Sequence, residues 1–378
     1  MVLGRALLSP KQKPRYLTRL DSIPELEPRE KRILEYVTGQ YAFRANDYYL
    51  SLIDWDDPDD PIRRIVIPNA GELEGGGSLD ASNESEYAVV PGLEHKYENT
   101  VLLLVNDVCG AYCRFCFRKR LFMDHNEEVS KDVSEGIAYI RRHEEIDNVL
   151  VTGGDPLLLS TARLEAILSS LRSIPHVKVI RIGTKMPAFN PHRVLNDPEL
   201  VDMLGTYSED DRKIYLMLHF NHPRELTEEA RAAIALFQSA GLALLNQTPL
   251  VRGVNDDPEI LAELFNAVSY MGVQPYYLFQ CRPTKGNGIY SLTLEESLDI
   301  FENAQNLCSG LAKSARLVMS HATGKMEIVG KSEEHIFIRY HRSPDPESAG
   351  RIMVMRRNPE AYWFDDLDPV EEYAAADY

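Results

Sequence analysis

Three cysteines stand within eight residues of one another in the segment CGAYCRFC, at Cys109, Cys113 and Cys116. Clustered thiolates are typical of sites for zinc, copper(I) or iron–sulfur clusters. A structural zinc site needs four ligands and usually pairs two such knuckles, but Cys281 and Cys308 stand alone in the sequence. Three thiolates on one loop suit a four-iron cluster with one iron open to a further ligand, because a closed cluster takes four cysteines. We predict such a cluster, with zinc or three unrelated thiols as the alternatives.

Composition and charge limit what else the chain can be. Its 378 residues carry a net charge of −17, and 44% of them are hydrophobic. General binders of nucleic acid or of anionic membranes need an excess of Lys and Arg, so neither partner is expected. We find no apolar run near 18 residues and no signal peptide, and five cysteines, three of them clustered, do not suit a secreted disulfide framework. The predicted compartment is a reducing one, the cytoplasm.

From residue 100 onward, short apolar runs alternate with segments that have the apolar spacing of helices. Largely apolar strands in such an alternation are typical of buried parallel strands with right-handed crossovers. We predict an α/β fold, a partial (β/α)6 barrel of the TIM type. An open doubly wound sheet is the alternative, but no glycine-rich dinucleotide fingerprint follows the first run. The six runs are TVLLLVN (100–106), NVLVTGG (148–154), VKVIRIG (177–183), KIYLMLHF (213–220), LALLNQ (242–247) and VQPYYLFQ (273–280).

The barrel is expected to lie between two extensions. Residues 1–95 are predicted to form a helical and irregular extension, residues 96–295 the barrel, and residues 296–378 a C-terminal segment with an acidic tail. The segment GELEGGGSLDASNESEY (71–87) has the composition of a solvated loop, because acidic runs rich in Gly and Ser usually stay in water. Chemistry in barrels lies at the carboxyl ends of the strands, so the segments after the six runs are expected to meet at one mouth.

The cysteine motif, with Phe115 before the third cysteine, resembles the signature of the radical S-adenosylmethionine (SAM) superfamily. Longer segments between residues 45 and 330 resemble the lysine 2,3-aminomutase family, in family order. The resemblance implies the partial barrel, a four-iron cluster, SAM, pyridoxal phosphate (PLP), and an isomerase that moves an α-amino group to the β-carbon. It also implies an amino acid substrate and an electron donor such as flavodoxin or ferredoxin, and it allows a homo-oligomer. The segments include VPGLEHKY, VLLLVNDVCGAYCRFCFRKR, VLVTGGDPLL, VIRIGTKMP, HFNHPRELTEE, NQTPLVRGVND and PYYLFQC.

By this resemblance, residues at the strand ends take defined roles. The three cysteines bind the cluster, and the loop TGGDP holds the amino group of SAM with Asp155 at its acidic position; a plain tight turn is the alternative. Arg118 clamps the α-carboxylate of the substrate with its guanidinium fork. Lys325 binds PLP covalently, which requires a desolvated pocket that lowers its pKa; a surface lysine is the alternative. SAM is further expected to contact Gly153, Gly154, Arg181 and His219 (otherwise a packed core histidine), and PLP to contact Lys96, Tyr97 and Gln247.

Four positions depart from the family pattern. Lys96 and Thr100 stand where family members have phosphate-binding arginines, so the phosphate grip is expected to be weaker or rebuilt from elsewhere. Arg282 and Val318 stand where lysine-acting members have two aspartates that bind the distal ammonium. A lysine substrate would meet a cation instead of an anion, a strong penalty in a dry pocket. We predict a 2,3-aminomutase of glutamate or aspartate, with Arg282 as a substrate-binding residue; lysine as substrate, or a PLP-free radical SAM reaction, is the alternative.

Three nearby features have plainer interpretations. Lys119 and Arg120 are expected to be surface charges, and Arg282 would face solvent if its loop is displaced from the pocket. Longer family members carry a cysteine-rich tail that binds zinc, whereas no cysteine follows Cys308 here, so no zinc is expected.

Overall fold

The computed structural model describes residues 13–123 and 126–370. Twelve strands form one sheet, in the order β14–β13–β12–β11–β10–β9–β8–β7–β6–β5–β4–β3. The pairings from β5 to β11 are parallel, and those at both margins are antiparallel. Because the outermost parallel strands pair with other strands, β5 with β4 and β11 with β12, and not with each other, the parallel strands form a partial barrel. The parallel strands are β5 (Thr100–Asn106), β6 (Asn148–Gly153), β7 (Val179–Thr184), β8 (Ile214–Leu218), β9 (Ala243–Pro249), β10 (Gln274–Phe279) and β11 (Arg316–His321).

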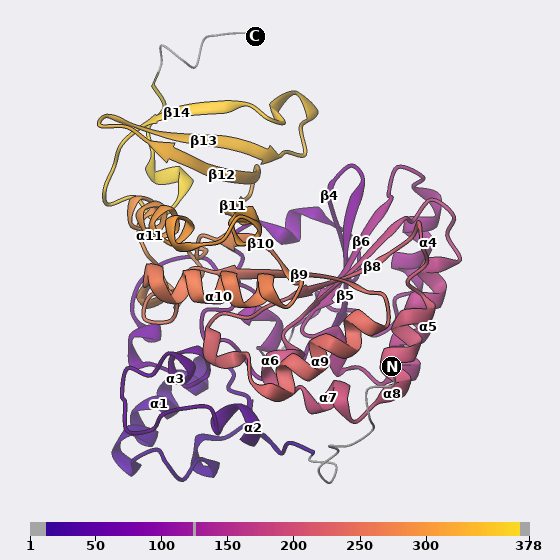
Figure 1. The fold of residues 1–378 in the computed structure, drawn as a ribbon. Coiled ribbons are helices and arrows are strands. Elements are labelled where there is room, and N and C mark those ends of the chain that lie inside the picture. Colours follow the sequence, from indigo (N-terminus) through magenta and orange to yellow (C-terminus); the bar gives the residue numbers. More distant parts are fainter. Residues whose placement is uncertain (1–12, 124–125, 371–378) are drawn as a thin grey trace.

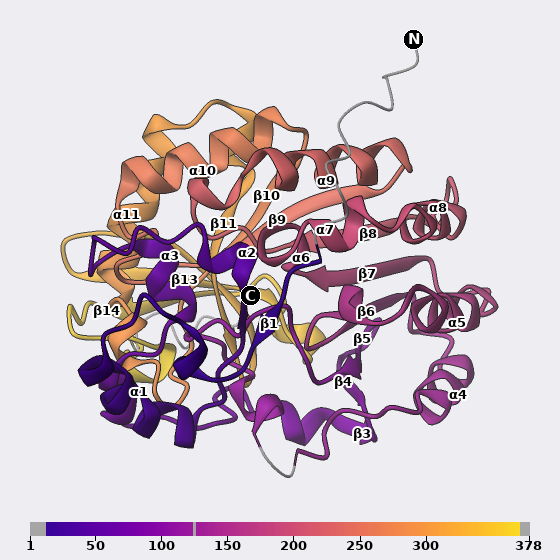
Figure 2. The ribbon, with the colours of Figure 1, turned by 90° about the horizontal axis from the view of Figure 1, so that it is seen from below.

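The predicted alternation of six strands with five longer helices is confirmed, and β11 adds a seventh parallel strand beyond the predicted six. The helices lie outside the arc of parallel strands when the molecule is viewed from below (Figure 2). Four of them begin at a side chain that accepts a hydrogen bond from the first turn, at Ser160, Asp197, Thr227 and Asp257. The helices of this part are α4 (Ser134–Arg142), α5 (Thr161–Arg172), α6 (Met186–Phe189), α7 (His192–Leu195), α8 (Pro198–Thr206), α9 (Glu228–Ser239) and α10 (Pro258–Tyr270).

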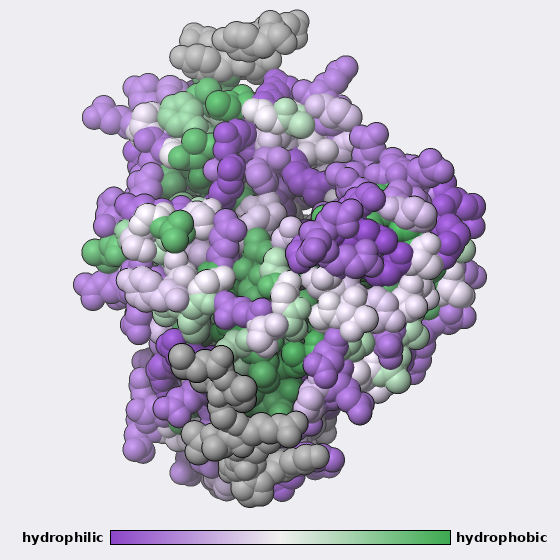
Figure 3. Space-filling view, turned by 45° about the vertical axis from the view of Figure 1, so that its right-hand side comes forward, coloured by the Kyte–Doolittle hydropathy of each residue, from purple (hydrophilic) through white to green (hydrophobic). Residues whose placement is uncertain are grey.

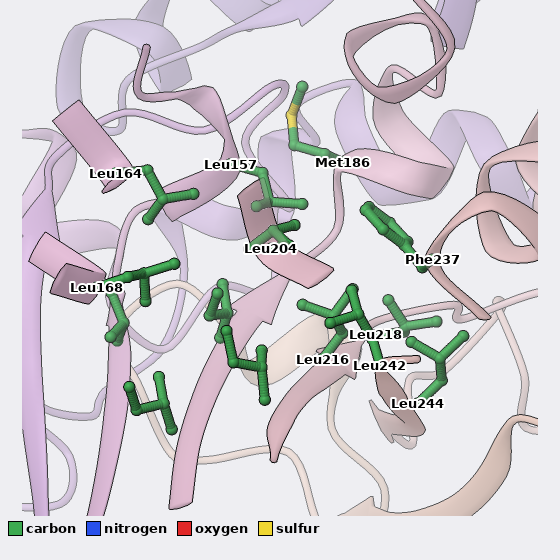
Figure 4. Packing of buried hydrophobic residues seen from close by; sticks show 14 of the residues in the cluster. Leu157, Leu164, Leu168, Met186, Leu204, Leu216, Leu218, Phe237, Leu242 and Leu244 are labelled. Atoms are coloured by element: carbon green, nitrogen blue, oxygen red, sulfur yellow. The ribbon is translucent and has the colours of Figure 1, made fainter. Parts of the chain in front are cut away.

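The main core lies between these helices and the outer face of the strands. Ile180 and Ile182 of β7 alternate with residues of the opposite face and are fully buried in the core. Leu216 and Leu218 of β8 pack there with Phe237 of α9 (Figure 4). The apolar runs of the sequence are therefore explained by helices that cover one face of every parallel strand.

The inner face of the strands surrounds a space that we call the lumen. Residues of this face remain partly exposed between fully buried neighbours, as Leu150, Arg181 and Gly183 do. A Cβ placed on Gly183 would lie within 4.0 Å of the side chains of Thr152, His219 and Leu150, so these residues share the lumen. A barrel interior packed solid by apolar side chains leaves no such exposure, so this face of the strands is not packed solid.

The N-terminal region packs on loops that follow the barrel strands. Its elements share a hydrophobic core with Phe115, Phe189 and Tyr290 of those loops. In Figure 1 its helices lie below the strands. Strand β4 (Leu93–Tyr97) pairs with β5 and spans the boundary predicted after residue 95. The other elements are β1 (Tyr16–Leu17), α1 (Pro28–Gln40), β2 (Ala45–Asn46), α2 (Asp47–Leu50), α3 (Pro61–Val66) and β3 (Ala88–Val90).

The C-terminal region extends the sheet beyond the barrel. Strands β12 (Gly324–Lys331), β13 (His335–Arg342) and β14 (Ile352–Arg356) follow β11 in antiparallel order and lie above the barrel in Figure 1. Helix α11 (Leu294–Leu307) spans the boundary predicted after residue 295. A third hydrophobic core joins this region to Leu250 and Leu278 of the barrel, so the C-terminal strands are packed against the barrel.

The surface adds little to the assignment of function. The face shown in Figure 3 is mostly hydrophilic, with smaller apolar areas between the polar ones. Within residues 13–123 and 126–370, no helix is long and apolar enough to cross a membrane.

Candidate active site

The cysteine loop follows β5 and is held by the N-terminal region. Arg44 Nε donates to the carbonyl of Cys109 at 2.8 Å, and Asn46 Nδ2 donates to the next carbonyl at 3.1 Å. The N–H of Arg114 donates to the carbonyl of Ile65, in the last turn of α3, at 2.8 Å. Each bond satisfies a backbone group of a loop that lies outside any strand ladder. The N-terminal region therefore fixes the position of the loop.

A buried ion pair fixes the same loop from a second side. Arg114 NH2 lies 2.8 Å from Glu72 Oε2, its Nε lies 3.0 Å from Oε1, and both side chains are at most 2% exposed. Tyr290 donates to the same carboxylate at 3.1 Å. The prediction of a solvated loop over residues 71–87 is wrong for Glu72, because this acid neutralises an arginine inside the molecule.

The thiols of Cys109, Cys113 and Cys116 are close enough to influence one another. Burial raises the pKa of all three, to about 12 for Cys113. Such thiols bind metals as thiolates, so a cluster that replaces their protons suits this place. In the described parts of the chain, no three His, Cys, Asp or Glu side chains converge on one metal ion. A four-iron cluster does not need such convergence, because each cysteine binds a different iron. The donor set thus fits the predicted cluster.

The glycine loop after β6 packs directly on the chain that leads into the cysteine loop. The N–H of Gly154 donates to the carbonyl of Asn106, and the N–H of Asp155 donates to that of Val108 at 2.9 Å. A Cβ on Gly154 would lie 2.5 to 2.7 Å from backbone atoms of Val108, and Gly153 has a φ of +109°. Both positions therefore require glycine. The loop expected to hold SAM is thereby fixed beside the loop expected to hold the cluster.

The carboxylate of Asp155 organises this unit. It accepts hydrogen bonds from Thr184 Oγ1 at 2.8 Å, from the N–H of Lys185 at 2.7 Å and from the N–H of Leu157 at 3.0 Å. Burial raises the pKa of Asp155 to about 6, and the bonds from Lys185 and Thr184 offset part of that rise. Asp155 thus joins the turns after β6 and β7, and its contact with SAM stays a prediction.

His219 and Gln247 meet in the lumen, from the ends of β8 and β9. Their Nε2 atoms lie 3.2 Å apart. Burial, and after it the charge of Lys185, lowers the pKa of His219 to about 3, so the imidazole is neutral. His219 and His222 belong to no group of three or more His, Cys, Asp or Glu side chains that could hold a metal ion within residues 13–123 and 126–370, and His222 Nδ1 accepts from the N–H of Arg224 at 3.2 Å. Neutral side chains at this place can hydrogen-bond a ligand without adding charge.

Arg118 and Arg282 lie side by side and share one carboxylate. Arg118 donates through Nε and NH2 to the two oxygens of Glu84 at 3.0 and 2.9 Å, and Arg282 NH1 lies 3.4 Å from Glu84 Oε1. Arg118 also donates to Thr152 Oγ1 of β6 at 3.2 Å. The Arg282 side chain is 15% exposed and lies 3.6 Å from the ring centre of Phe117. This excludes the alternative of a solvent-facing Arg282.

Glu84 lies at the centre of this arginine cluster, which we define as Arg118, Arg120 and Arg282. Arg120 NH2 donates to it at 2.8 Å. Burial alone would raise the pKa of Glu84, but Arg118 and Arg282 hold it below its usual value, so the carboxylate is charged. The solvated-loop prediction for residues 71–87 is therefore wrong for Glu84 as well. A second acid, Glu94, lies 3.7 Å from Arg118, and burial followed by the charge of Glu84 raises its pKa to about 7.

Lys119 and Arg120 are not the surface charges that were expected. Arg120 pairs with Glu84 and with Glu128, whose Oε1 lies 2.8 Å from its Nε. Lys119 is buried, and its Nζ lies 4.5 Å from the ring centre of Tyr41 without a hydrogen-bond partner among the residues described. Burial lowers the pKa of Lys119 to about 8. The short helical turn after the cysteines directs both side chains inward.

Lys325 projects from β12 to the aromatic side chains of β10. Its Nζ lies 4.1 Å from the ring centre of Tyr277 and 5.2 Å from that of Phe279. Burial lowers the pKa of Lys325 well below its usual value, and the charges of Arg181 and Arg342 lower it further. The alternative of a surface lysine is excluded. The neutral amine is the form that attacks an aldehyde, and a lowered pKa favours this form, as the PLP-binding role requires.

Arg181 lies away from the glycine loop, with which it was expected to bind SAM. Its Nε donates to Asn148 Oδ1, at the first residue of β6, at 2.8 Å. The glycine loop TGGDP begins four residues later, at Thr152, which is roughly 13 Å along a strand. Arg181 lies near enough to Lys325 to lower its pKa, and the contact of Arg181 with SAM stays a prediction. Lys96 belongs to the same neighbourhood: burial, and then the charge of Arg282, lowers its pKa to about 8.

Two residues of the site were not among the sequence candidates. Glu84 lies in a segment of loop-like composition, so the sequence gives no direct indication that it is buried. It could have been found only by asking which acid balances the charges of Arg118, Arg120 and Arg282. Arg342 lies at the end of β13, with its guanidinium 4.4 Å from the ring centre of Tyr97 and its NH2 3.1 Å from Thr100 Oγ1. The feature of the sequence that could have pointed to Arg342 is Thr100, which stands where family members have an arginine and so calls for an arginine from elsewhere.

Comparisons with known proteins agree with this arrangement. Residues 103–265 match the model of the radical SAM superfamily. The chain is 59% identical over 367 residues to a protein of Aquifex aeolicus described as a putative L-lysine 2,3-aminomutase, across 97% of this chain and 98% of the relative. It is 41% identical to the L-lysine 2,3-aminomutase of Clostridium subterminale, across 76% and 68%. It is 35% identical to the glutamate 2,3-aminomutase of Clostridioides difficile, across 85% and 76%.

Proposed function

Since the chain belongs to the lysine 2,3-aminomutase family of radical SAM enzymes, we propose that it is a PLP-dependent 2,3-aminomutase of an acidic amino acid, glutamate or aspartate. Family membership makes it an isomerase with a four-iron cluster and SAM as cofactors. When bound, the cofactors supply the radical chemistry and the transfer of the amino group, and a small reducing protein suits as electron donor. The chain supplies position and keeps water out.

The proposed substrate class rests on the pairing of Arg118 and Arg282. Both guanidinium groups bind the carboxylate of Glu84, so they lie within reach of the two ends of a short ligand. Glutamate and aspartate carry a carboxylate at each end, and a guanidinium fork is the group that binds carboxylates best. Arg118 would hold the α-carboxylate and Arg282 the distal one, with Lys325 on the PLP side.

The acids beside Arg118 give little support to a lysine substrate. Glu84 already accepts hydrogen bonds from the arginine cluster. Glu94, with its pKa raised to about 7, is largely protonated below neutral pH. A distal ammonium placed beside Arg282 would face a like charge in a desolvated site, and this repulsion disfavours binding.

Lysine is the second candidate substrate, and the names of the relatives favour it. The relative from Aquifex aeolicus and that from Clostridium subterminale are described as lysine 2,3-aminomutases, and their identity to this chain exceeds that of the glutamate enzyme. The two candidates differ in the charge that Arg282 meets, so a direct assay separates them.

The test is an anaerobic assay of the enzyme reconstituted with iron, sulfide and PLP. After reduction, SAM is added with glutamate, aspartate or lysine, and β-amino acids are measured by chromatography with mass detection. We expect β-glutamate or β-aspartate. β-Lysine alone would overturn the acidic substrate while keeping the reaction class. SAM cleavage without any β-amino acid, together with no PLP absorbance band, would favour a PLP-free reaction.

A variant tests the role of Arg282 within that assay. Arg282→Ala should raise KM for the acidic substrate about 10- to 100-fold, because a charge-assisted hydrogen bond is lost. Arg252→Ala is the matched control, since this arginine is 41% exposed and pairs with Glu296. An unchanged KM in Arg282→Ala would remove Arg282 from the substrate site.

A further inference from the structure

Four cationic side chains gather where β5 and β6 begin, at the end of the lumen opposite the cysteine loop. Arg342 NH2 lies 3.1 Å from Thr100 Oγ1, and Thr100 pairs with Asn148, the residue that Arg181 binds through Nε at 2.8 Å. Lys325 is near enough to Arg181, Arg342 and Lys96 for all three charges to lower its pKa. The basic group thus consists of Lys96, Arg181, Lys325 and Arg342.

The hydrogen bonds of the basic group within the described chain all go to neutral partners. Lys96 Nζ donates to the carbonyl of His321 at 2.6 Å. Arg342 NH2 donates to Asn99 Oδ1 at 2.7 Å and to the Thr100 hydroxyl, and none of the four cations forms an ion pair within 4.0 Å among residues 13–123 and 126–370. By contrast, the arginine cluster elsewhere in the lumen is paired with the carboxylate of Glu84. Glu84 and Glu94 act on Lys96 only from beyond ion-pair distance, so the basic group keeps an excess of positive charge. Such an excess suits an anion of more than one charge, such as a phosphate.

The position of Arg342 follows from the pairing of β12 with β13. Lys325 and Arg342 are directly opposite residues of these antiparallel strands, so their side chains leave the sheet on the same face. The guanidinium is held over Tyr97, at 4.4 Å from the ring centre, and its two hydrogen bonds within the described chain use NH2 alone. Nε and NH1 therefore remain for a ligand beside Lys325.

We propose that Arg342 binds the phosphate of PLP, and that it supplies from β13 the guanidinium that other family members carry at the position of Thr100. The inference rests on the proposed use of PLP. Thr100 is too short to replace an arginine by itself, but its hydroxyl and Asn99 orient the guanidinium of Arg342 at that place. Arg181 and Lys96 add positive charge, while the Lys325 amine meets the aldehyde of the same cofactor.

The test compares the binding of PLP with that of pyridoxal, which has the aldehyde and ring but no phosphate. Both are titrated into the anaerobically reconstituted enzyme, and binding is followed by absorbance. Arg342→Gln should weaken PLP binding about 10- to 100-fold and leave pyridoxal binding unchanged, since one charge-assisted contact to phosphate is lost. Arg342→Lys should recover part of the loss. Arg356→Ala, at an exposed arginine of β14, is the control and should bind both as the wild type does.

Each result decides the proposal. If Arg342→Gln binds PLP as tightly as the wild type, Arg342 does not hold the phosphate. If it weakens PLP and pyridoxal equally, the effect comes from the fold of the pocket and the proposal is equally overturned. A wild-type enzyme that binds no PLP would instead contradict the proposed function itself, so the two failures are distinct.

Discussion

Glu84 and Arg118 form a bidentate ion pair inside the molecule, although one lies in a loop before the barrel and the other follows the cysteines. The two oxygens of Glu84 accept from Nε and NH2 of Arg118 at 3.0 and 2.9 Å. Since Arg282 and Arg120 use the same carboxylate, one acid sets the distance between arginines from the first and sixth strand ends. Glu84 is therefore a positioning residue for the substrate-binding arginines.

Replacement of Glu84 by glutamine tests this role. Glu84→Gln keeps the shape of the side chain but leaves three guanidinium groups close together without their counter-charge. Breaking a buried pair costs about 3 kcal/mol or more, so the free energy of unfolding should fall by that amount in urea titrations. KM for the amino acid should rise while SAM binding stays unchanged, because Arg118 loses its fixed orientation.

Glu86→Gln is the matched control, since Glu86 is exposed in the same short turn. It should leave both the unfolding free energy and KM at wild-type values. If Glu84→Gln behaves like this control, the carboxylate does not position the arginines, and Arg118 and Arg282 are held by other contacts.

The barrel could be predicted from the sequence because its signals are local. Apolar runs and helix spacing recur in order from residue 100, and the cysteines and glycines stand beside the strands that position them. The inward burial of Glu72 and Glu84 could not be predicted, because a loop-like composition says nothing of arginines that fold against it from elsewhere in the chain. Composition describes a segment alone, whereas burial of a charge depends on its partner.

The position of Arg342 was hidden for a different reason. A strand over residues 335–342 can be recognised locally, but its register against β12 includes two irregular steps, and a shift of one residue turns every side chain to the other face. Arg181 shows the converse. The motif RIGTK suggests that Arg181 lies near the other residues at the strand ends. Arg181 itself lies three residues before the end of β7, at the level of Leu150.

A labelling experiment tests the lowered pKa of Lys325. Because burial and neighbouring cations lower its pKa, Lys325 should react with PLP at a lower pH than an ordinary lysine does. Borohydride then fixes the bound PLP, and peptide mapping identifies the labelled residue. Lys325→Arg should abolish the label, whereas Lys331→Arg, on the same strand and paired with Asp299, should retain it. Labelling spread over many lysines would contradict a perturbed Lys325.

The close packing of the glycine loop on the chain before the cysteines predicts that a larger residue at Gly154 weakens binding of the iron–sulfur cluster. In Gly154→Ala, the new Cβ would lie 2.5 to 2.7 Å from the backbone of Val108, so the chain that leads into the cysteine loop must move. Reconstituted protein should hold less than half the wild-type iron, measured chemically and by the absorbance of the cluster. Gly310→Ala is the control, because nothing lies within 4 Å of its Cβ position. Full iron content in Gly154→Ala would show that the two loops are independent.

The raised pKa of Glu94 predicts that the stability of the protein depends on pH. Burial, and then the charge of Glu84, raises its pKa from 4.5 to about 7 in the folded protein. Between these values the folded state keeps a proton that the unfolded chain has released, so stability falls as the pH rises. Glu94→Gln removes this penalty, and its gain in unfolding free energy should grow from about 1 kcal/mol at pH 5 to about 3 kcal/mol at pH 8.

Urea titrations of the wild type and of Glu94→Gln at both pH values measure this gain. Glu98→Gln serves as the control, since Glu98 is exposed beside the same strand, and its difference from the wild type should not change with pH. A gain that is equal at both pH values would mean that Glu94 titrates alike in the folded and unfolded chains. In that case Glu94 would be ionised beside Arg118 at neutral pH. Its negative charge could then attract a substrate ammonium, which would weaken the argument against a lysine substrate.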